Sequence, residues 1–410
     1  MKVFNFIVSV LLIISILISC KKNVSTQNPA SPTDLDTSKI NDIIYTASSS
    51  SGTVYALNAK DGSIKWSTNL YSNLNYSGIH SSPTLVDGIL YLGCPPNRVV
   101  AIDARTGIIK WNSILGIQSN AFYCSPLVAN NILYIGRTNK FYGINATDGT
   151  IKWSFTESSG GAIANQFDAS SPCIFQNVVY VNAVDCPNEG LYGFDAQTGV
   201  VKLFNNQGGA KYASVTSPCV YNNVIYNAFT NNAYGSGSFY KLNLTNYQPI
   251  PGNFYLPSTC MSSPTVFNGT VYFGSANYLF SYDDNSNNTN PLKWQFQFSS
   301  AVSNSSPTAD SNNVYIGCGN RFLYAIKTSD GSKRWEYNTF RNSANNGGET
   351  SPTLANGIIY YGTPDGLFAI TAETGSLVWY NSGVGRIYSS PCVISKTGEI
   401  FHSGISGVKN

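Results

Sequence analysis

The chain has 410 residues, of which 42% are hydrophobic and 13% aromatic, so it is long enough and apolar enough to bury a sizeable core. Only 11% of the residues are charged, and the formal net charge is +3 at pH 7. A charge this small gives no support for nucleic acid or anionic lipid as a partner.

The first residues have the features of an export signal. Lys2 is followed by an almost wholly apolar run, 3–18, which leads into Ser19 and Cys20. This ending resembles the bacterial lipoprotein signal, in which the cysteine carries lipid, so we expect a signal peptide at 1–19 and lipidation of Cys20. An uncleaved membrane anchor is the alternative, but the run is short for the roughly 20 residues that span a bilayer. Residues 20–41 are rich in Ser, Thr, Asn and Pro and read as a flexible tether.

From residue 42 onward the chain consists of short strands. Residues 43–70 read as three strands, and 81–112 read as four, joined by tight turns that contain Gly88 and Gly107. The four-strand unit recurs every 39 to 46 residues, marked by the proline of a Ser-Pro pair: Pro83, Pro126, Pro172, Pro218, Pro264, Pro307, Pro352 and Pro391. All six tryptophans end a unit: Trp66, Trp111, Trp153, Trp294, Trp335 and Trp379. A period of this length with four strands indicates a β-propeller.

The two ends of the repeat complete each other. The first three strands lack a preceding Ser-Pro strand, whereas the last Ser-Pro strand, after Pro391, has no tryptophan after it. We therefore expect an all-β, eight-bladed β-propeller of four-stranded antiparallel blades over 42–410, closed by N- and C-terminal strands that share a blade. A further strand-like segment, 399–403, is either a fifth outer strand or a replacement for the N-terminal one.

Three consecutive units are irregular. The unit from Pro172 has Leu203 in place of tryptophan, the unit from Pro218 lacks both the Thr-Gly turn and the tryptophan, and the unit from Pro264 carries a polar insertion at 283–291. Relaxed constraint and a dedicated binding side explain this equally well. Eight cysteines follow Cys20, and their shared repeat phases favour small core positions over disulfides. If a disulfide forms, Cys94 with Cys124 is the first pair to test.

The segments AIDARTGIIKW, ALNAKDGSIKW and AITAETGSLVW share the pattern Ala-x-Asp/Asn/Thr-x-x-x-Gly-x-x-x-Trp. This pattern resembles the quinoprotein-type, PQQ-like β-propeller repeat family. The resemblance implies that each tryptophan docks between neighbouring blades, near the glycine of a turn. The family includes dehydrogenases that bind pyrroloquinoline quinone with calcium, and non-catalytic propellers. A lipid-anchored ring with little beyond it is more similar to the non-catalytic branch, which includes the propeller subunit of outer-membrane β-barrel assembly.

In such propellers the first strand lies nearest the axis, so the residue three before each proline should lie near the mouth of the channel. With their close neighbours, these positions give a candidate binding set: His80, Tyr123, Asp168, Asn304, Glu349, Arg386 and Tyr388. Asn304 and Glu349 in neighbouring blades are the best argument for a calcium site. A polar, solvated channel mouth is the simpler interpretation. Three arginines that follow second strands are either ordinary loop residues or a basic belt for an acidic partner: Arg98, Arg137 and Arg321.

The sequence contains no catalytic constellation, because only two histidines are present and no Cys-x-x-Cys motif occurs. We therefore expect a protein-binding scaffold without enzymatic activity, metal or cofactor. The resemblance implies a monomeric propeller that is lipid-anchored in the bacterial envelope, at the outer membrane facing the periplasm, with envelope proteins and no nucleic acid as partners. The alternatives are a periplasmic dehydrogenase that uses pyrroloquinoline quinone and calcium, and a propeller that binds polysaccharide through loop Tyr, Phe and Asn.

Overall fold

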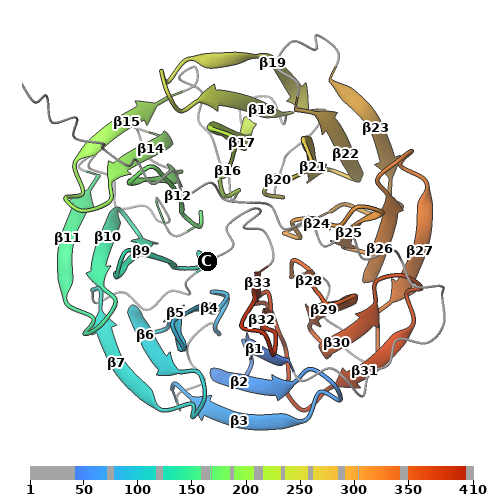
Figure 1. Cartoon of the computed structure of the whole chain (residues 1–410), viewed down its shortest axis with the longest axis horizontal. Coiled ribbons are helices and arrows are strands. Elements are labelled where there is room, and N and C mark those ends of the chain that lie inside the picture. Colours follow the sequence, from blue (N-terminus) through green and yellow to red (C-terminus); the bar gives the residue numbers. More distant parts are fainter. Residues whose placement is uncertain are drawn as a thin grey trace, which may run out of the picture. The chain divides into compact units, whose positions relative to one another are not determined.

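The computed structural model describes residues 42–71, 78–116, 123–157, 167, 169–184, 189–206, 216–231, 236–256, 262–284, 291–302, 304–341 and 350–402. All of them lie in one compact unit, Asp36–Asn410. They form eight antiparallel sheets, the blades of a β-propeller, as predicted (Figure 1). In each blade the first strand of the repeat lies toward the axis and the fourth lies at the rim. No helix in the described part of the chain has the length and hydropathy needed to cross a membrane.

The first four blades contain the following strands. Blade 1 has β1 (Ile43–Ala47), β2 (Thr53–Asn58), β3 (Ile64–Asn69), β32 (Cys392–Ile394) and β33 (Ile400–His402). Blade 2 has β4 (Thr84–Val86), β5 (Ile89–Cys94), β6 (Arg98–Asp103) and β7 (Ile109–Ile114). Blade 3 has β8 (Leu127–Ala129), β9 (Ile132–Arg137), β10 (Lys140–Asn145) and β11 (Ile151–Thr156). Blade 4 has β12 (Cys173–Phe175), β13 (Val178–Ala183), β14 (Gly190–Asp195) and β15 (Val201–Asn205).

The other four blades follow the same plan. Blade 5 has β16 (Cys219–Tyr221), β17 (Val224–Asn231), β18 (Ser236–Asn243) and β19 (Pro249–Leu256). Blade 6 has β20 (Thr265–Phe267), β21 (Thr270–Ser275), β22 (Tyr278–Asp283) and β23 (Leu292–Gln297). Blade 7 has β24 (Thr308–Ala309), β25 (Asn313–Cys318), β26 (Phe322–Lys327) and β27 (Lys333–Asn338). Blade 8 has β28 (Thr353–Ala355), β29 (Ile358–Thr363), β30 (Gly366–Thr371) and β31 (Leu377–Asn381).

The serine of every Ser-Pro pair belongs to a closed ring of hydrogen bonds. Each serine donates its backbone N–H to the side-chain oxygen of the equivalent serine in the next blade, at 2.8 to 3.1 Å. The eight members of this serine belt are Ser82, Ser125, Ser171, Ser217, Ser263, Ser306, Ser351 and Ser390. The following proline has no N–H, which suits the unpaired inner edge of a blade. The belt therefore ties all eight first strands together.

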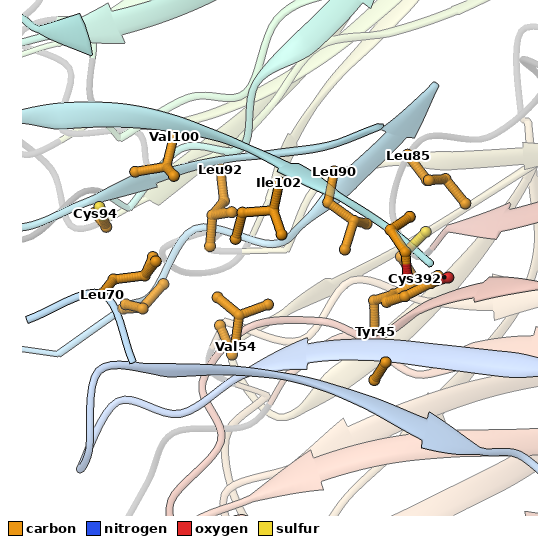
Figure 2. Close-up of a cluster of buried hydrophobic side chains, with 14 residues drawn as sticks. Tyr45, Val54, Leu70, Leu85, Leu90, Leu92, Cys94, Val100, Ile102 and Cys392 are labelled. Carbon is orange, nitrogen blue, oxygen red and sulfur yellow. Dashed lines mark hydrogen bonds between the residues drawn. The ribbon is translucent and has the colours of Figure 1, made fainter. Parts of the chain in front are cut away.

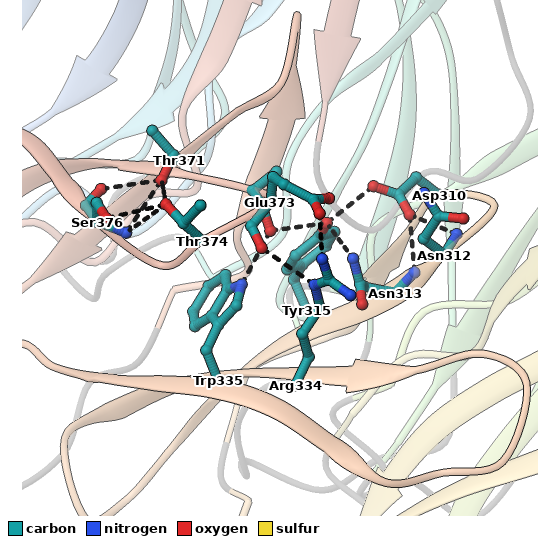
Figure 3. Close-up of polar contacts among 11 residues, drawn as sticks. Asp310, Asn312, Asn313, Tyr315, Arg334, Trp335, Thr371, Glu373, Thr374 and Ser376 are labelled. Atoms are coloured by element: carbon teal, nitrogen blue, oxygen red, sulfur yellow. Dashed lines mark hydrogen bonds and ion pairs between the residues drawn. The ribbon is translucent and has the colours of Figure 1, made fainter. Parts of the chain in front are cut away.

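The tryptophans join the blades at the rim, as the resemblance implied. Each indole N–H donates to a backbone carbonyl of the next blade: Trp66 to Ala104, Trp111 to Ala146, Trp153 to Ala196, Trp294 to Thr328, Trp335 to Ala372 and Trp379 to Ala59. Figure 3 shows the junction of blades 7 and 8, where the Tyr315 hydroxyl donates to the same carbonyl as Trp335. At the junction of blades 1 and 2, a Cβ on Gly107 would lie 2.7 Å from the Trp66 ring. The turn glycine is needed there because the ring lies directly on it.

The ring is closed as predicted, but the extra C-terminal strand lies on the opposite side from the one expected. β1 pairs with β32, with Tyr45 opposite Cys392. β33 then pairs with the other edge of β32, so blade 1 has five strands in the order β3-β2-β1-β32-β33. The expectation of a fifth outer strand, or of a replacement for the N-terminal strand, was wrong. Because β1 already occupies the outer edge of β32, only the inner edge remains for β33, which also contacts β28 of blade 8.

The irregular junction of blades 4 and 5 is repacked. Blade 4 has Leu203 where other blades have tryptophan, and Tyr247 of blade 5 takes the place of the turn glycine, with a φ of 57°. Leu203 and Tyr247 belong to the same apolar cluster. The smaller leucine leaves room for a side chain on the turn. Behind them, Asn182 and Asn227 exchange two buried amide hydrogen bonds of 2.8 and 2.7 Å between the blades.

The junction of blades 5 and 6 uses charge instead of an indole. Lys241, on β18, is buried at the position where other blades have a small residue opposite tryptophan. Asp284 of blade 6 follows β22 where five other blades have alanine, and it accepts a hydrogen bond from the Tyr226 hydroxyl. Burial raises the pKa of Asp284, and the hydrogen bond from Tyr226 and the positive charge of Lys241 oppose this shift in part. The irregular units therefore pack against their neighbours through contacts that replace the tryptophan and the turn glycine of the regular blades.

Six of the cysteines lie in the described part of the chain, and all six are buried free thiols: Cys94, Cys124, Cys173, Cys219, Cys318 and Cys392. Cys94 and Cys392 lie among apolar side chains between blades 1 and 2 (Figure 2). Cys124 lies in the next apolar cluster, between blades 2 and 3. The tentative Cys94–Cys124 disulfide is therefore wrong, and the interpretation as core positions is confirmed. Cys186 and Cys260 lie outside the described residues.

Candidate binding site before the first strands

The candidate residues are held in place by the chain that leads into each first strand. The residue two before each proline is small and buried, and in several blades it bonds to the second strand of its own blade. Ser81 accepts a hydrogen bond from the backbone N–H of Gly93 at 3.0 Å, and Ser389 accepts one from Ala47 at 2.9 Å. These contacts fix the backbone of the preceding residues, His80 and Tyr388.

Three of the predicted residues form a continuous stack across blades 1, 2 and 3. The ring centroids of Tyr388 and His80 are 5.1 Å apart with the rings stacked at 30°. The centroids of His80 and Tyr123 are 5.0 Å apart with an angle of 51°. Both separations lie within the range that aromatic pairs prefer. The imidazole of blade 2 therefore lies between a phenol from each neighbouring blade.

Arg386 extends the stack in blade 1. Its guanidinium carbon lies 5.9 Å from the centre of the Tyr388 ring, within the distance of a cation–π contact. Ile387 between them is fully buried, so Arg386 and Tyr388 both extend away from the core. The backbone is tied to the turn after β1, because Ser49 donates its N–H to the Arg386 carbonyl at 2.8 Å. We call Arg386, Tyr388, His80 and Tyr123 the aromatic stack.

Burial lowers the pKa of His80 to about 4, because the charged imidazolium loses hydration. The imidazole is therefore neutral at neutral pH and acts as an aromatic ring. The neutral imidazole packs between the two phenols without burying a charge, and it lacks the charge needed to attract an anion.

The other predicted residues do not join this stack. Asn304 is exposed before β24 in blade 7. Asp168 and Glu349 lie outside the described residues, as does Cys20. Among the residues that the structure describes, no three His, Cys, Asp or Glu side chains lie close enough to hold a metal ion. The proposed calcium pair of Asn304 and Glu349 therefore has one member, Glu349, outside the described residues.

The basic belt is also wrong as a surface feature. Arg137 is only 1% exposed and its guanidinium donates to Asn97. Arg98 donates to the backbone carbonyl of Leu70. Arg321 stacks on the Phe340 ring at 4.8 Å. Arg98 begins β6 and Arg137 ends β9, and their guanidinium groups bond to the preceding blade, whereas Arg321 packs on a ring.

The structure also contains features that the sequence reasoning missed. The repeat predicted which residues share a level, but not that His80, Tyr123 and Tyr388 touch. The serine belt was missed as well, although its signal, a serine before each of the eight prolines, is plain in the sequence.

Known proteins resemble the chain in sequence and in fold. An assembly factor BamB from Vibrio cholerae is 32% identical over 114 residues, which cover 25% of this chain and 29% of that protein. A tetrathionate hydrolase from Acidithiobacillus ferrooxidans is 23% identical over 243 residues, covering 55% and 46% of the two chains. These matches span less than half the length of either relative. The crystal structure of BamB from Moraxella catarrhalis superposes with a TM-score of 0.59 at 17% identity, covering 80% of this chain and 91% of that one, and shows the shared fold.

A family model described as "Outer membrane protein assembly factor BamB", of the PQQ-like repeat type, matches residues 24–130, 116–253 and 253–397. These matches run through every blade of the propeller. The chain therefore belongs to the BamB-like family of PQQ-like repeat propellers.

Proposed function

We propose that this chain is a non-catalytic scaffold of the bacterial envelope that binds other envelope proteins during outer-membrane protein assembly. The observation that carries the proposal is the family match over residues 24–397. The assembly factors from Vibrio cholerae, Moranella endobia and Yersinia pestis among its relatives point in the same direction.

The proposal includes a lipid anchor at Cys20, with residues 1–19 removed as a signal peptide. Support comes from the apolar run 3–18 and the Leu-Ile-Ser-Cys ending at 17–20. Labelling cells with a radioactive fatty acid tests this directly. The full chain should carry label, and the Cys20→Ser variant should carry none. Equal labelling of the two proteins would contradict the anchor.

The proposed scaffold is a monomer that acts without a cofactor. Adding calcium and pyrroloquinoline quinone to the pure protein should produce neither bound quinone absorbance nor a shift in melting temperature. Bound quinone would contradict the proposal and favour a dehydrogenase.

Capture of partners tests the scaffold role itself. The tagged full chain is purified from detergent-solubilised membranes after mild crosslinking, and bound proteins are identified by mass spectrometry. Outer-membrane proteins should be enriched over a control purification of an unrelated lipoprotein. Recovery of no envelope protein above that background would contradict the proposed function.

A further inference from the structure

The aromatic stack has one capped end and one open end. At the capped end, the Arg386 guanidinium lies over Tyr388. At the open end, Tyr123 is 54% exposed. The equivalent position in the next blade, blade 4, holds Ala169. The series of rings therefore stops at blade 3, and a small side chain occupies the place where the next ring would lie.

The repeat sets the spacing of such a series. Successive ring centroids in the stack are 5.1 and 5.0 Å apart, because the rings come from equivalent positions in neighbouring blades. A ring placed above Ala169 continues the series on the free side of Tyr123. Ring separations of about 4.5 to 7 Å are those that aromatic side chains prefer.

Among the described residues, the serine hydroxyls next to the stack already accept hydrogen bonds, whereas the Arg386 Nε at the capped end is buried without a partner. The hydroxyls of Ser82, Ser125 and Ser390 accept hydrogen bonds in the serine belt. The hydroxyls of Ser81 and Ser389 accept hydrogen bonds from second strands. A sugar needs fixed hydrogen-bonding groups beside the ring on which it stacks, whereas an aromatic side chain needs only the ring face. The described serines near the open end therefore favour an aromatic side chain over a sugar.

We propose that the aromatic stack binds an aromatic side chain of a partner polypeptide, which stacks on Tyr123 above Ala169. The inference rests on the proposed function, because the strands of outer-membrane β-barrels carry aromatic residues at both membrane interfaces. Before such a barrel closes, these side chains are available in an extended chain. The partner is an unfolded β-barrel strand, and its aromatic residue is the recognised group.

A peptide titration tests the proposal. The probe is a fluorescent ten-residue peptide with the sequence of an outer-membrane barrel strand that contains one phenylalanine, and its dissociation constant for the full chain is measured by anisotropy. Tyr123→Ala should weaken binding about tenfold, which corresponds to about 1.4 kcal/mol. Tyr123→Phe should keep the affinity, because the ring remains. A peptide with alanine in place of phenylalanine should bind wild type as weakly as the original peptide binds Tyr123→Ala.

A second variant fills the open place from within the chain. Ala169→Phe supplies the missing ring and should block the peptide, whereas Ala169→Ser should not. Phe204→Ala removes a ring that is 43% exposed on the rim strand β15 and is the matched control, with unchanged affinity expected. Circular dichroism and melting temperature show whether each variant is folded. Unchanged binding to folded Tyr123→Ala and Ala169→Phe would overturn the proposal.

Two further outcomes separate this inference from the proposed function. If membrane capture with Tyr123→Ala recovers the same envelope proteins as wild type, the stack is not their binding site, although the scaffold role stands. If wild type captures no envelope protein, the proposed function fails. If an outer-membrane polysaccharide binds in a Tyr123-dependent manner and the peptide does not, the site is a glycan site and the proposal is overturned.

Discussion

Adding a methyl group to Gly107 should destabilise the propeller by more than the backbone conformation alone explains. Gly107 has a φ of 75°, and a Cβ there would lie 2.7 Å from the Trp66 ring and 2.8 Å from the Thr68 hydroxyl oxygen. An L-residue at positive φ costs about 1 kcal/mol. Overpacking of the indole adds roughly 1–3 kcal/mol. Gly107→Ala should therefore lower the free energy of unfolding by about 2–4 kcal/mol.

Gly88 is the matched control. It has a φ of 74°, and a Cβ there would meet nothing within 4 Å. Gly88→Ala should cost only the conformational term of about 1 kcal/mol. The difference between the two variants isolates the contact between blades.

A double-mutant cycle then tests the mechanism. Trp66→Leu alone should cost about 3 kcal/mol through the lost ring and the space it leaves. In the Trp66→Leu background, Gly107→Ala should cost only about 1 kcal/mol, because the clash is gone. The chain itself uses this combination at the junction of blades 4 and 5, where Leu203 faces Tyr247. Urea unfolding followed by far-ultraviolet circular dichroism measures all four proteins. Additive effects, or equal costs for Gly88→Ala and Gly107→Ala, would refute the reasoning.

Three further variants probe the belt, the charged junction and the buried histidine. Ser306→Ala removes the buried acceptor of the Ser263 N–H, so it should cost about 1–3 kcal/mol in urea unfolding; a neutral effect would contradict the serine belt. Lys241→Met should destabilise the fold by up to about 3 kcal/mol, because Asp284 loses its opposing charge, and adding Asp284→Ala should recover most of this loss; no recovery would count against the pairing. The pKa of His80 is lowered to about 4 from about 6.5 in the unfolded chain, so protons bind the unfolded state preferentially as the pH falls from 6.5 to 4. Over that window wild type should lose at most about 3 kcal/mol more than His80→Phe, and parallel curves of unfolding free energy against pH would contradict the burial of His80.

The spacing of the Ser-Pro pairs predicted the number of blades, because the period reports one supersecondary unit per repeat. It also predicted that the strand after Pro391 completes the first blade. The position of the extra strand was not predictable in the same way. The segment 399–403 predicts that a strand forms, but not the strand edge with which it pairs. It pairs with the inner edge of β32 because β1 already occupies the outer edge.

The irregular junctions show a second limit. Within its own unit, each of Leu203 and Tyr247 is only the loss of a repeat residue. The structure brings them into one cluster, where the loss of the indole makes room for the tyrosine. The charges of Lys241 and Asp284 are likewise explained only by their proximity across the junction of blades 5 and 6. A residue change in one blade that compensates for a change in the next can be recognised from sequence only when the contact between the two positions is already known.

The candidate site was predicted in part. Repeat phase placed His80, Tyr123 and Tyr388 at one level, because equivalent positions in a closed ring are equivalent in space. Whether the rings touch depends on side-chain rotamers and on the spacing between blades, which the sequence does not contain. Ala169 holds the equivalent position in blade 4, and its importance follows only from the exposed Tyr123 ring in blade 3.

The most direct test of the account is photo-crosslinking in living bacterial cells that express the full chain. A photoreactive phenylalanine analogue replaces Tyr123 in one variant and Phe204 on β15 in the other. We expect unfolded outer-membrane β-barrel proteins to be captured from position 123 and not from position 204. Absence of barrel proteins at position 123, or equal capture at both positions, would contradict a scaffold that holds its partners at the aromatic stack.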